Sequence, residues 1–160
     1  MRRFAPMMLT LAALTAPLSA QKPAAHPDLV GSWTLDPKKS EGTGLPQSMT
    51  LKVAKDPKLM TINRVGMTEM GEQRSTLIVN LDGTPTKNTI TTQGASVDLF
   101  LTGSWEGPEF VLKTKANIGG QSLDQTDRWT VDASGKNLRI ATTLTGGGQT
   151  KTQTLAFAKQ

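Results

Sequence analysis

The strongest constraint on the fold is an alternation of polar and apolar residues that runs through most of the chain. The segment Thr50-Leu51-Lys52-Val53 shows it in its simplest form. Leu138, Ile140 and Thr142 likewise alternate with Arg139 and Ala141. A period of two places successive side chains on opposite faces of an extended strand. The pattern therefore predicts β-strands with one buried and one hydrated face. Beyond residue 21, no stretch keeps a helical period.

Turn-forming residues interrupt these runs at short intervals. Asp82-Gly83 and Ser134-Gly135 are pairs that supply the positive φ of tight hairpins. The longest breaks are 37–46 and 65–73, and we expect a short helical turn or a lid at either. The intervening runs predict about ten strands, at 29–35, 48–54, 58–65, 74–81, 87–93, 96–105, 109–116, 122–131, 137–144 and 149–158.

Strands of this number, joined by short hairpins, predict the fold class. The expectation is an all-β chain with a single antiparallel up-and-down meander. A meander of this length has two exposed edges, and closure into a barrel hides them. We therefore predict one up-and-down barrel of about eight to ten strands.

Residues 1–20 have the layout of a secretory signal peptide. Arg2 and Arg3 precede an apolar stretch, and the small residue Ala20 precedes the expected cut. A membrane anchor is the alternative, but the apolar stretch is short for a bilayer span and is broken by prolines. We expect cleavage, no stable membrane insertion afterwards, and a periplasmic or extracellular location. The expected organisation is a signal peptide at 1–20, a flexible lead at 21–28 and a barrel domain at 29–160.

Charge and cysteine content exclude several classes of protein. The chain has 18 basic and 13 acidic residues, and loss of Arg2 and Arg3 leaves a net charge of about +3. These charges are scattered, whereas nucleic-acid binding requires a basic patch with interleaved aromatics. The absence of tyrosine and the many outward-facing charges argue against an outer-membrane barrel. No cysteine is present, so neither disulfides nor a lipid-modified cysteine anchor is available.

Two local motifs resemble a known family. The segment 30–40, with Gly31-Ser32-Trp33-Thr34-Leu35, resembles the opening of secreted bacterial lipocalin-like proteins of unassigned function. The segment 128–138, which begins Arg128-Trp129, is similar to their late hairpin. The resemblance implies a calycin-type barrel, as in lipocalins and fatty-acid-binding proteins. In lipocalins the first-strand Trp plugs the closed end and an Arg near the last strand packs over it. Trp33 matches the first part, whereas the last strand offers Lys151 but no Arg.

The sequence contains no recognisable catalytic or metal-binding constellation. His26 is the sole histidine and stands in the expected lead, so we interpret it as a solvated linker residue. Asp124 and Asp127 are close in sequence but fall on opposite faces of a predicted strand. Gly146-Gly147-Gly148 follows a strand with no helix pattern after it, which indicates a hairpin rather than a phosphate loop. We therefore predict no catalytic residue, no metal and no cofactor.

The alternation of residues along each predicted strand, or strand parity, also defines which side chains are expected inside the barrel. The candidate ligand-lining residues are Trp33, Leu51, Met60, Ile62, Arg64, Leu77, Val79, Leu99, Leu101, Leu112, Gln125, Trp129 and Ile140. The polar residues Asn88, Asp127 and Lys151 share this parity. An inward Arg64 would pair with an acidic head group, as inward arginines do in fatty-acid-binding proteins. The alternative is that Arg64 lies near a strand end and reaches water.

Two functions fit these sequence features. The first is an exported, non-enzymatic binding protein for a small hydrophobic or amphipathic molecule in the barrel interior, which requires an open cavity. The alternative is a secreted or envelope protein-interaction module, an inhibitor or a structural part, with a filled barrel. It predicts an exposed apolar patch on a loop face, at 45–49 or 67–70. The fold itself does not exclude an enzyme. The family resemblance favours the binding protein.

Overall fold

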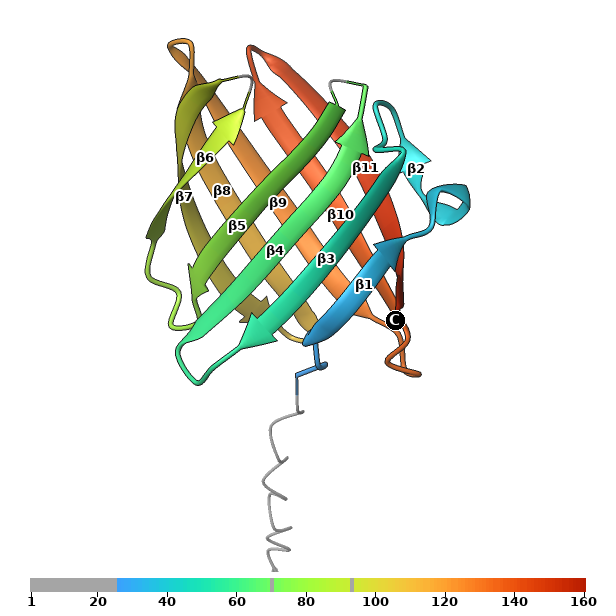
Figure 1. Ribbon diagram of the computed structural model, residues 1–160. Coiled ribbons are helices and arrows are strands. Elements are labelled where there is room, and N and C mark those ends of the chain that lie inside the picture. Colours follow the sequence, from blue (N-terminus) through green and yellow to red (C-terminus); the bar gives the residue numbers. More distant parts are fainter. Residues whose placement is uncertain (1–25, 70, 93) are drawn as a thin grey trace, which may run out of the picture.

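The computed structural model describes residues 26–160, apart from residues 70 and 93. Figure 1 shows one antiparallel sheet rolled into a nearly closed barrel. The sheet has eleven strands: β1 Gly31–Leu35, β2 Glu41–Gly42, β3 Ser48–Lys55, β4 Leu59–Thr68, β5 Gly71–Asn80, β6 Thr86–Thr92, β7 Ala95–Glu106, β8 Glu109–Ile118, β9 Gln121–Val131, β10 Asn137–Gly146 and β11 Gln149–Lys159. A single turn of 3-10 helix, η1, spans Pro37–Lys39.

The order of hydrogen-bonded strands is β5-β4-β3-β1-β11-β10-β9-β8-β7-β6. Nearly all neighbours are consecutive in sequence, which confirms the predicted up-and-down meander. All ten predicted strands are present. Residues 65–73, expected as a break with a helical turn or a lid, instead complete β4 and begin β5. That hairpin is tight, and Gly71 has a φ of 96°, which favours glycine.

The other predicted break, 37–46, contains η1 and also β2, which the sequence pattern did not predict. β1 pairs with β11 as far as Leu35 and Phe157. The chain then leaves the sheet as η1, and the Ser40 hydroxyl accepts a hydrogen bond from the Ala156 amide at 3.0 Å. At Glu41 it returns to pair with β11. β2 is therefore the continuation of the first strand beyond a local excursion.

The barrel closes between β1 and β11 and leaves a seam between β5 and β6, the two ends of the hydrogen-bonded order. Asn88 bridges this seam with its side-chain amide. Its Oδ1 accepts from the Ile78 amide at 2.7 Å, and its Nδ2 donates to the Ile78 carbonyl at 2.9 Å. The Asn80 amide donates to the Thr86 hydroxyl nearby, at 3.1 Å. Side chains thus fasten the seam next to the β5–β6 turn.

The hairpins alternate between two ends of the barrel (Figure 1). The upper end carries the turns at 68–71, 92–95, 118–121 and 146–149. The lower end carries the turns at 55–59, 80–86, 106–109 and 131–137, together with the segment that precedes β1. The interior accordingly has an upper half and a lower half.

A packed apolar core fills the lower half. Its largest fully buried side chains include Trp33, Trp129 and Phe110. Phe110 lies edge-on to Trp129, with ring centroids 6.3 Å apart. The Trp33 indole donates to the Leu29 carbonyl at 3.0 Å, which fixes the segment before β1 across this end. Trp33 therefore lies in the packed lower half of the barrel.

His26 lies outside this core and is exposed. Its ring stacks on Trp105 with the centroids 4.4 Å apart, and its Nδ1 lies 3.3 Å from the Gly107 carbonyl oxygen.

The predicted signal peptide at 1–20 and most of the predicted flexible lead lie outside the described residues. Within the part of the chain that the structure describes, no helix is long and apolar enough to cross a membrane.

Candidate ligand site in the upper half of the barrel

The inner wall changes from apolar to polar toward the upper end. On β4, the inward residues Met60 and Ile62 are fully buried, and Arg64 follows them toward the upper end. On β9, Trp129 is fully buried, and Asp127 and Gln125 follow it in the same direction. Polar groups inside a protein wall require partners. A ligand with a polar group therefore matches the upper half of the interior rather than the lower half.

The structure places the sequence-predicted lining residues on the inner face, in two groups. The first group is buried in the core: Trp33, Leu51, Met60, Ile62, Leu77, Val79, Leu101, Leu112, Trp129 and Ile140. The second group is partly exposed: Arg64, Leu99 and Gln125. A molecule that enters the folded barrel without displacing the core can touch the second group. Ligand contact by any of these residues remains a prediction.

A pocket of about 260 Å³ lies at the upper part of the seam. It is lined by Met49, Arg64, Gly66, Thr68, Gln73, Arg74, Ser75, Ile90 and Thr91. Arg64, Ser75 and Ile90 lie on the inward parity of their strands, whereas Arg74 and Thr91 are exposed on the outward parity. Residues of both faces of the wall therefore border the pocket at the seam between β5 and β6, on the upper side of the bridge made by Asn88.

Arg64 lies in this pocket with unused hydrogen-bonding capacity. It is held in register between Leu51 of β3 and Ser75 of β5. Its Nε is buried and has no hydrogen-bond partner among the described residues. A guanidinium has five N–H donors in a planar fork that matches a carboxylate. The Arg64 guanidinium can therefore form hydrogen bonds to an anionic group in this pocket.

The neighbouring Arg74 is already engaged. It faces outward, and its Nε binds the Glu72 carboxylate at 2.6 Å. This hydrogen bond lowers the pKa of Glu72 and raises that of Arg74. Because Arg74 has a carboxylate partner and Arg64 has none among the described residues, Arg64 is the better anion-binding group of the two.

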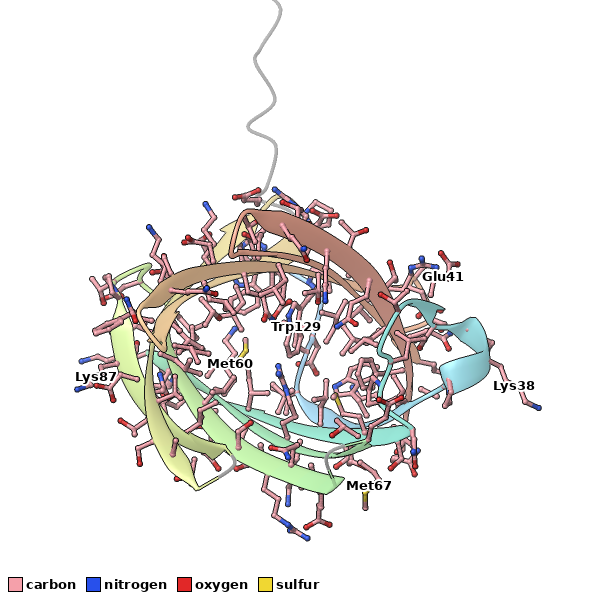
Figure 2. The ribbon with its side chains drawn as sticks, turned by 90° about the horizontal axis from the view of Figure 1, so that it is seen from above. Lys38, Glu41, Met60, Met67, Lys87 and Trp129 are labelled. Atoms are coloured by element: carbon pink, nitrogen blue, oxygen red, sulfur yellow. The ribbon has the colours of Figure 1, made fainter. Side chains whose placement is uncertain are left out.

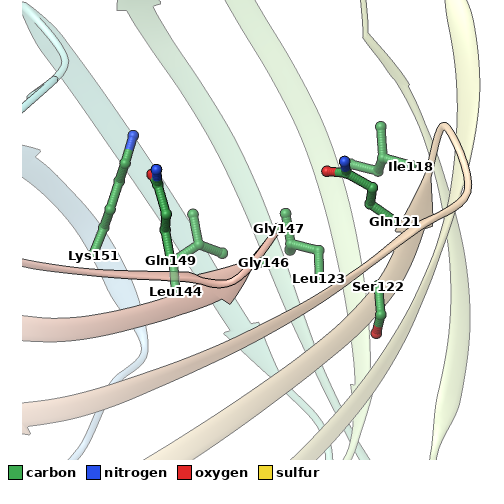
Figure 3. A pocket seen from close by; sticks show the side chains of 9 residues that line it. All are labelled: Ile118, Gln121, Ser122, Leu123, Leu144, Gly146, Gly147, Gln149 and Lys151. Carbon is green, nitrogen blue, oxygen red and sulfur yellow. The ribbon is translucent and has the colours of Figure 1, made fainter.

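A second pocket, of about 290 Å³, lies at the upper rim over β8 to β11 (Figure 3). It is lined by Ile118, Gln121, Ser122, Leu123, Leu144, Gly146, Gly147, Gln149 and Lys151. Figure 3 shows the Leu123 and Leu144 side chains on one side of the wall, and Ser122 pointing to the other. The Lys151 ammonium, predicted on the inward parity, stands at the edge of this pocket. The upper end therefore offers apolar surface next to basic groups.

A larger hollow, of about 590 Å³, lies at the lower end between the β3–β4 and β5–β6 turns. Its polar groups are already used by the turns. The Asp56 carboxylate accepts from the Lys58 and Leu59 amides at 2.8 and 2.7 Å, and these bonds lower its pKa. Among the described residues that line this hollow, none has a buried, unpaired donor such as the Nε of Arg64, so we do not regard it as a ligand site.

The sequence pattern missed part of the seam pocket. Gln73 lay within the break expected at 65–73, so it was never assigned to a strand face. Ser75 and Leu77 lie on the same face of their strand, and extension of this alternation by two residues toward the N-terminus places Gln73 inside as well.

Asp124 is exposed and Asp127 is buried, so the prediction that they occupy opposite faces is confirmed. Among the described residues, no three His, Asp or Glu side chains are grouped so that they could hold a metal ion.

Comparison with models of protein families gives no match, and neither does comparison with curated proteins. Solved structures are more informative. A secretory abundant heat soluble protein from Ramazzottius varieornatus aligns with a TM-score of 0.53 at 12% identity, over 82% of this chain and 95% of that chain. The alignment shows a shared fold.

Two further solved structures cover a similar share of the chain at lower scores. Zebrafish ileal bile acid-binding protein, complexed with cholic acid, has a TM-score of 0.48 at 16% identity, over 82% of this chain and 98% of that chain. A Schistosoma mansoni fatty acid binding protein, in complex with arachidonic acid, has a TM-score of 0.47 at 15% identity, over 82% and 95%. The predicted fold is confirmed: the chain is an all-β, nearly closed up-and-down antiparallel barrel.

Proposed function

We propose that this chain is an exported, non-enzymatic binding protein for a small amphipathic molecule, with the ligand's acidic group on Arg64. The ligand would occupy the upper half of the barrel and enter through the seam pocket or over the rim. Its apolar part would lie against Leu99 and the rim side chains Leu123 and Leu144. The lower core would remain intact and serve as the floor of the site.

The observation that carries the proposal is the buried, unpartnered Nε of Arg64. An unsatisfied buried donor costs about 1–3 kcal/mol, and more when the group is charged. In a protein whose sheet hydrogen bonds are otherwise well formed, such a group indicates a site that a ligand or ordered water completes. The free apolar surface at the same end supplies the second half of an amphipathic site.

Isothermal titration calorimetry with dodecanoate tests this function, with dodecanol as the uncharged ligand of matched length. We expect dodecanoate to bind the protein and Arg64→Gln to weaken that binding roughly tenfold or more, because a charge-assisted hydrogen bond contributes about 1.5–3 kcal/mol. Arg139→Gln is the control, since Arg139 is exposed on the outer face of β10. It should bind dodecanoate as the unmodified protein does.

Dodecanol should bind the unmodified protein and Arg64→Gln equally. If Arg64→Gln keeps full affinity for dodecanoate, Arg64 is not the anion site. If neither ligand binds, the carrier function is wrong for acyl chains, and the alternative below takes its place.

Export is part of this proposal and rests on the composition of residues 1–20. Expression of the full chain in a bacterial host, followed by intact-mass measurement of the exported fraction, tests it. A mature chain that begins at Gln21 supports export with cleavage after Ala20. A full-length chain retained in the cytoplasm contradicts it. The same measurement on periplasm and medium separates the two expected locations.

The alternative function is a secreted or envelope protein-interaction module with a filled barrel. Two observations favour it: the lower half is tightly packed, and Phe100, on the outward parity of β7, is half exposed. Met67, in a loop region expected to carry an interaction patch, is also exposed. Native mass spectrometry of the exported protein distinguishes the two functions. An apo mass that persists after incubation with fatty acids and host lipids favours the interaction module.

A further inference from the structure

We infer that Asp127, on the inner wall of β9, forms with Trp129 a second polar subsite that takes a hydroxyl group of the ligand. This inference rests on the proposed function, since it concerns the same interior. It names the substrate class: an acidic amphipathic molecule that carries a hydroxyl group, rather than a plain acyl chain.

The Asp127 carboxyl is enclosed in the wall by a small polar network. Only 2% of the residue is exposed. Its Oδ1 accepts from the Thr142 hydroxyl at 2.7 Å and from the Gln125 Nε2 at 2.9 Å. Among the described residues, its Oδ2 accepts only from the same Gln125 Nε2, at 2.9 Å. A carboxylate has about four acceptor positions, so Oδ2 keeps capacity for another donor.

No basic side chain among the described residues forms an ion pair with Asp127, although six such contacts join other residues of the barrel. Burial of a carboxyl group without a cation is unfavourable, and an apolar side chain of similar size serves wall packing equally well. Leu112, the register partner of Asp127 on β8, is such a side chain. Packing of the wall therefore does not explain a carboxyl at position 127.

Trp129 supplies the second, independent observation. It is the next inward residue on β9, and it is fully buried. Its Nε1 has no hydrogen-bond partner among the described residues. The other indole of the core, Trp33, does have one, the Leu29 carbonyl. Figure 2 shows Trp129 inside the ring of strands.

The pair selects a hydroxyl over other polar groups. Asp127 Oδ2 offers an unused acceptor, and Trp129 Nε1 is an unused donor. A hydroxyl donates one hydrogen bond and accepts others, so a single group can satisfy both. An ammonium group only donates, and it would leave the indole without a partner. A carboxylate only accepts, and it would meet the Asp127 carboxyl as a like group.

Access to this subsite is from the upper rim. Gln125 is the register partner of Leu144, which lines the rim pocket, and Asp127 is the register partner of Thr142. The Asp127–Thr142 pair therefore lies one inward step further down the barrel than the Gln125–Leu144 pair. Gln125 is only partly buried, so its side chain is the group that a ligand must displace or join.

Calorimetry with dodecanoic acid, its mid-chain and terminal hydroxy derivatives, and the terminal amino derivative tests the inference. We expect at least one hydroxy acid to bind roughly tenfold tighter than dodecanoic acid, the ratio expected of one added hydrogen bond to a charged group. Asp127→Leu and Trp129→Phe should each reduce this ratio toward one. The ratio is taken within each variant, so a change in the affinity for dodecanoic acid itself does not enter it.

Trp33→Phe is the matched control, because it removes an indole N–H that already has a partner. It should lower stability and leave the hydroxy preference unchanged. If dodecanoic acid binds but no hydroxy derivative binds more tightly than it does, this inference is overturned and the proposed function stands. Tighter binding of the amino derivative alone overturns the assignment to a hydroxyl. Absence of binding by every probe overturns the proposed function and this inference together.

Discussion

The Lys159 ammonium lies over the indole of Trp33, with Nζ 5.1 Å from the ring centroid. Lys159 ends β11, and the two residues are direct register partners across the β1–β11 closure of the barrel. A cation over the face of an indole is attracted by the negative potential of the ring. The pair therefore joins the first and last strands at the lower end, next to the Leu29 carbonyl that holds the indole N–H.

Lys159→Met should lower the free energy of unfolding by about 0.5–1 kcal/mol, the usual contribution of a cation–π contact near the surface. Methionine keeps most of the apolar stem, so loss of the charge dominates the change. Urea denaturation followed by tryptophan fluorescence measures it. Lys159→Arg should keep the interaction, and Lys52→Met, at an exposed position on β3, should have little effect. Equal losses for Lys159→Met and Lys52→Met would contradict the assignment.

Asn88→Ala should open the seam between β5 and β6. The substitution removes both hydrogen bonds to the Ile78 backbone, and groups left without partners in a partly buried seam cost about 1–3 kcal/mol. We expect a loss of stability in that range and faster hydrogen exchange at the Ile78 amide. Asn63→Ala is the matched control, because the Asn63 side chain accepts its hydrogen bond from the Thr76 hydroxyl on the exposed surface. If exchange at Ile78 is unchanged in Asn88→Ala, the side chain does not fasten the seam.

The sequence predicted the fold well because the information that determines a meander is local. Alternation assigns each strand and its faces, and turn residues assign the hairpins. The seam was beyond this reasoning, because nothing local distinguishes the pair β5 and β6 from other consecutive strands. The sequence pattern also ended the last strand at residue 158, one residue short of Lys159. Lys159, the basic residue that lies over the Trp33 indole, therefore falls outside the predicted strand.

The candidate site was predicted less completely than the fold. Parity placed Arg64, Gln125 and Asp127 on the inner face, and the structure agrees. Parity carries no information about depth, so Met60 and Arg64 were equal candidates although the first is in the core and the second borders a pocket. Depth depends on which hairpins share an end of the barrel, and on which polar atoms find partners. Both are properties of the closed barrel.

Gly103→Ala should destabilise the barrel through overpacking. A Cβ at this position would lie 2.5 Å from Val79 Cγ1 and 2.7 Å from Phe110 Cζ, closer than carbon atoms approach each other. Insertion of a methyl group into a packed core typically costs about 1–3 kcal/mol. Gly146→Ala, whose Cβ would have a nearest contact of 3.4 Å to the Ser122 carbonyl oxygen, should cost less. Thermal unfolding of the two variants gives the comparison, and equal costs would contradict close packing across the seam at Gly103.

Asp132 should make part of the stability depend on acid pH. Its carboxylate accepts from the Asn137 side chain at 2.6 Å, the Ser134 hydroxyl at 2.8 Å and the Lys136 amide at 3.1 Å, and these bonds lower its pKa from 3.8 to about 2. Because the folded pKa lies below the unfolded one, this contribution is complete above pH 3.8 and disappears as the pH falls through about 2.

The stability difference between the unmodified protein and Asp132→Asn should therefore shrink as the pH falls across this range. Urea denaturation at several pH values measures it, and NMR titration of the Asp132 carboxyl carbon gives the pKa directly. Ser134→Ala removes one of the donors, so it should raise the pKa of Asp132 part of the way toward 3.8. A titration midpoint at 3.8 in the folded, unmodified protein would show that the β9–β10 turn does not hold the carboxylate as described. A midpoint near 2 that Ser134→Ala shifts upward would identify these hydrogen bonds as the cause.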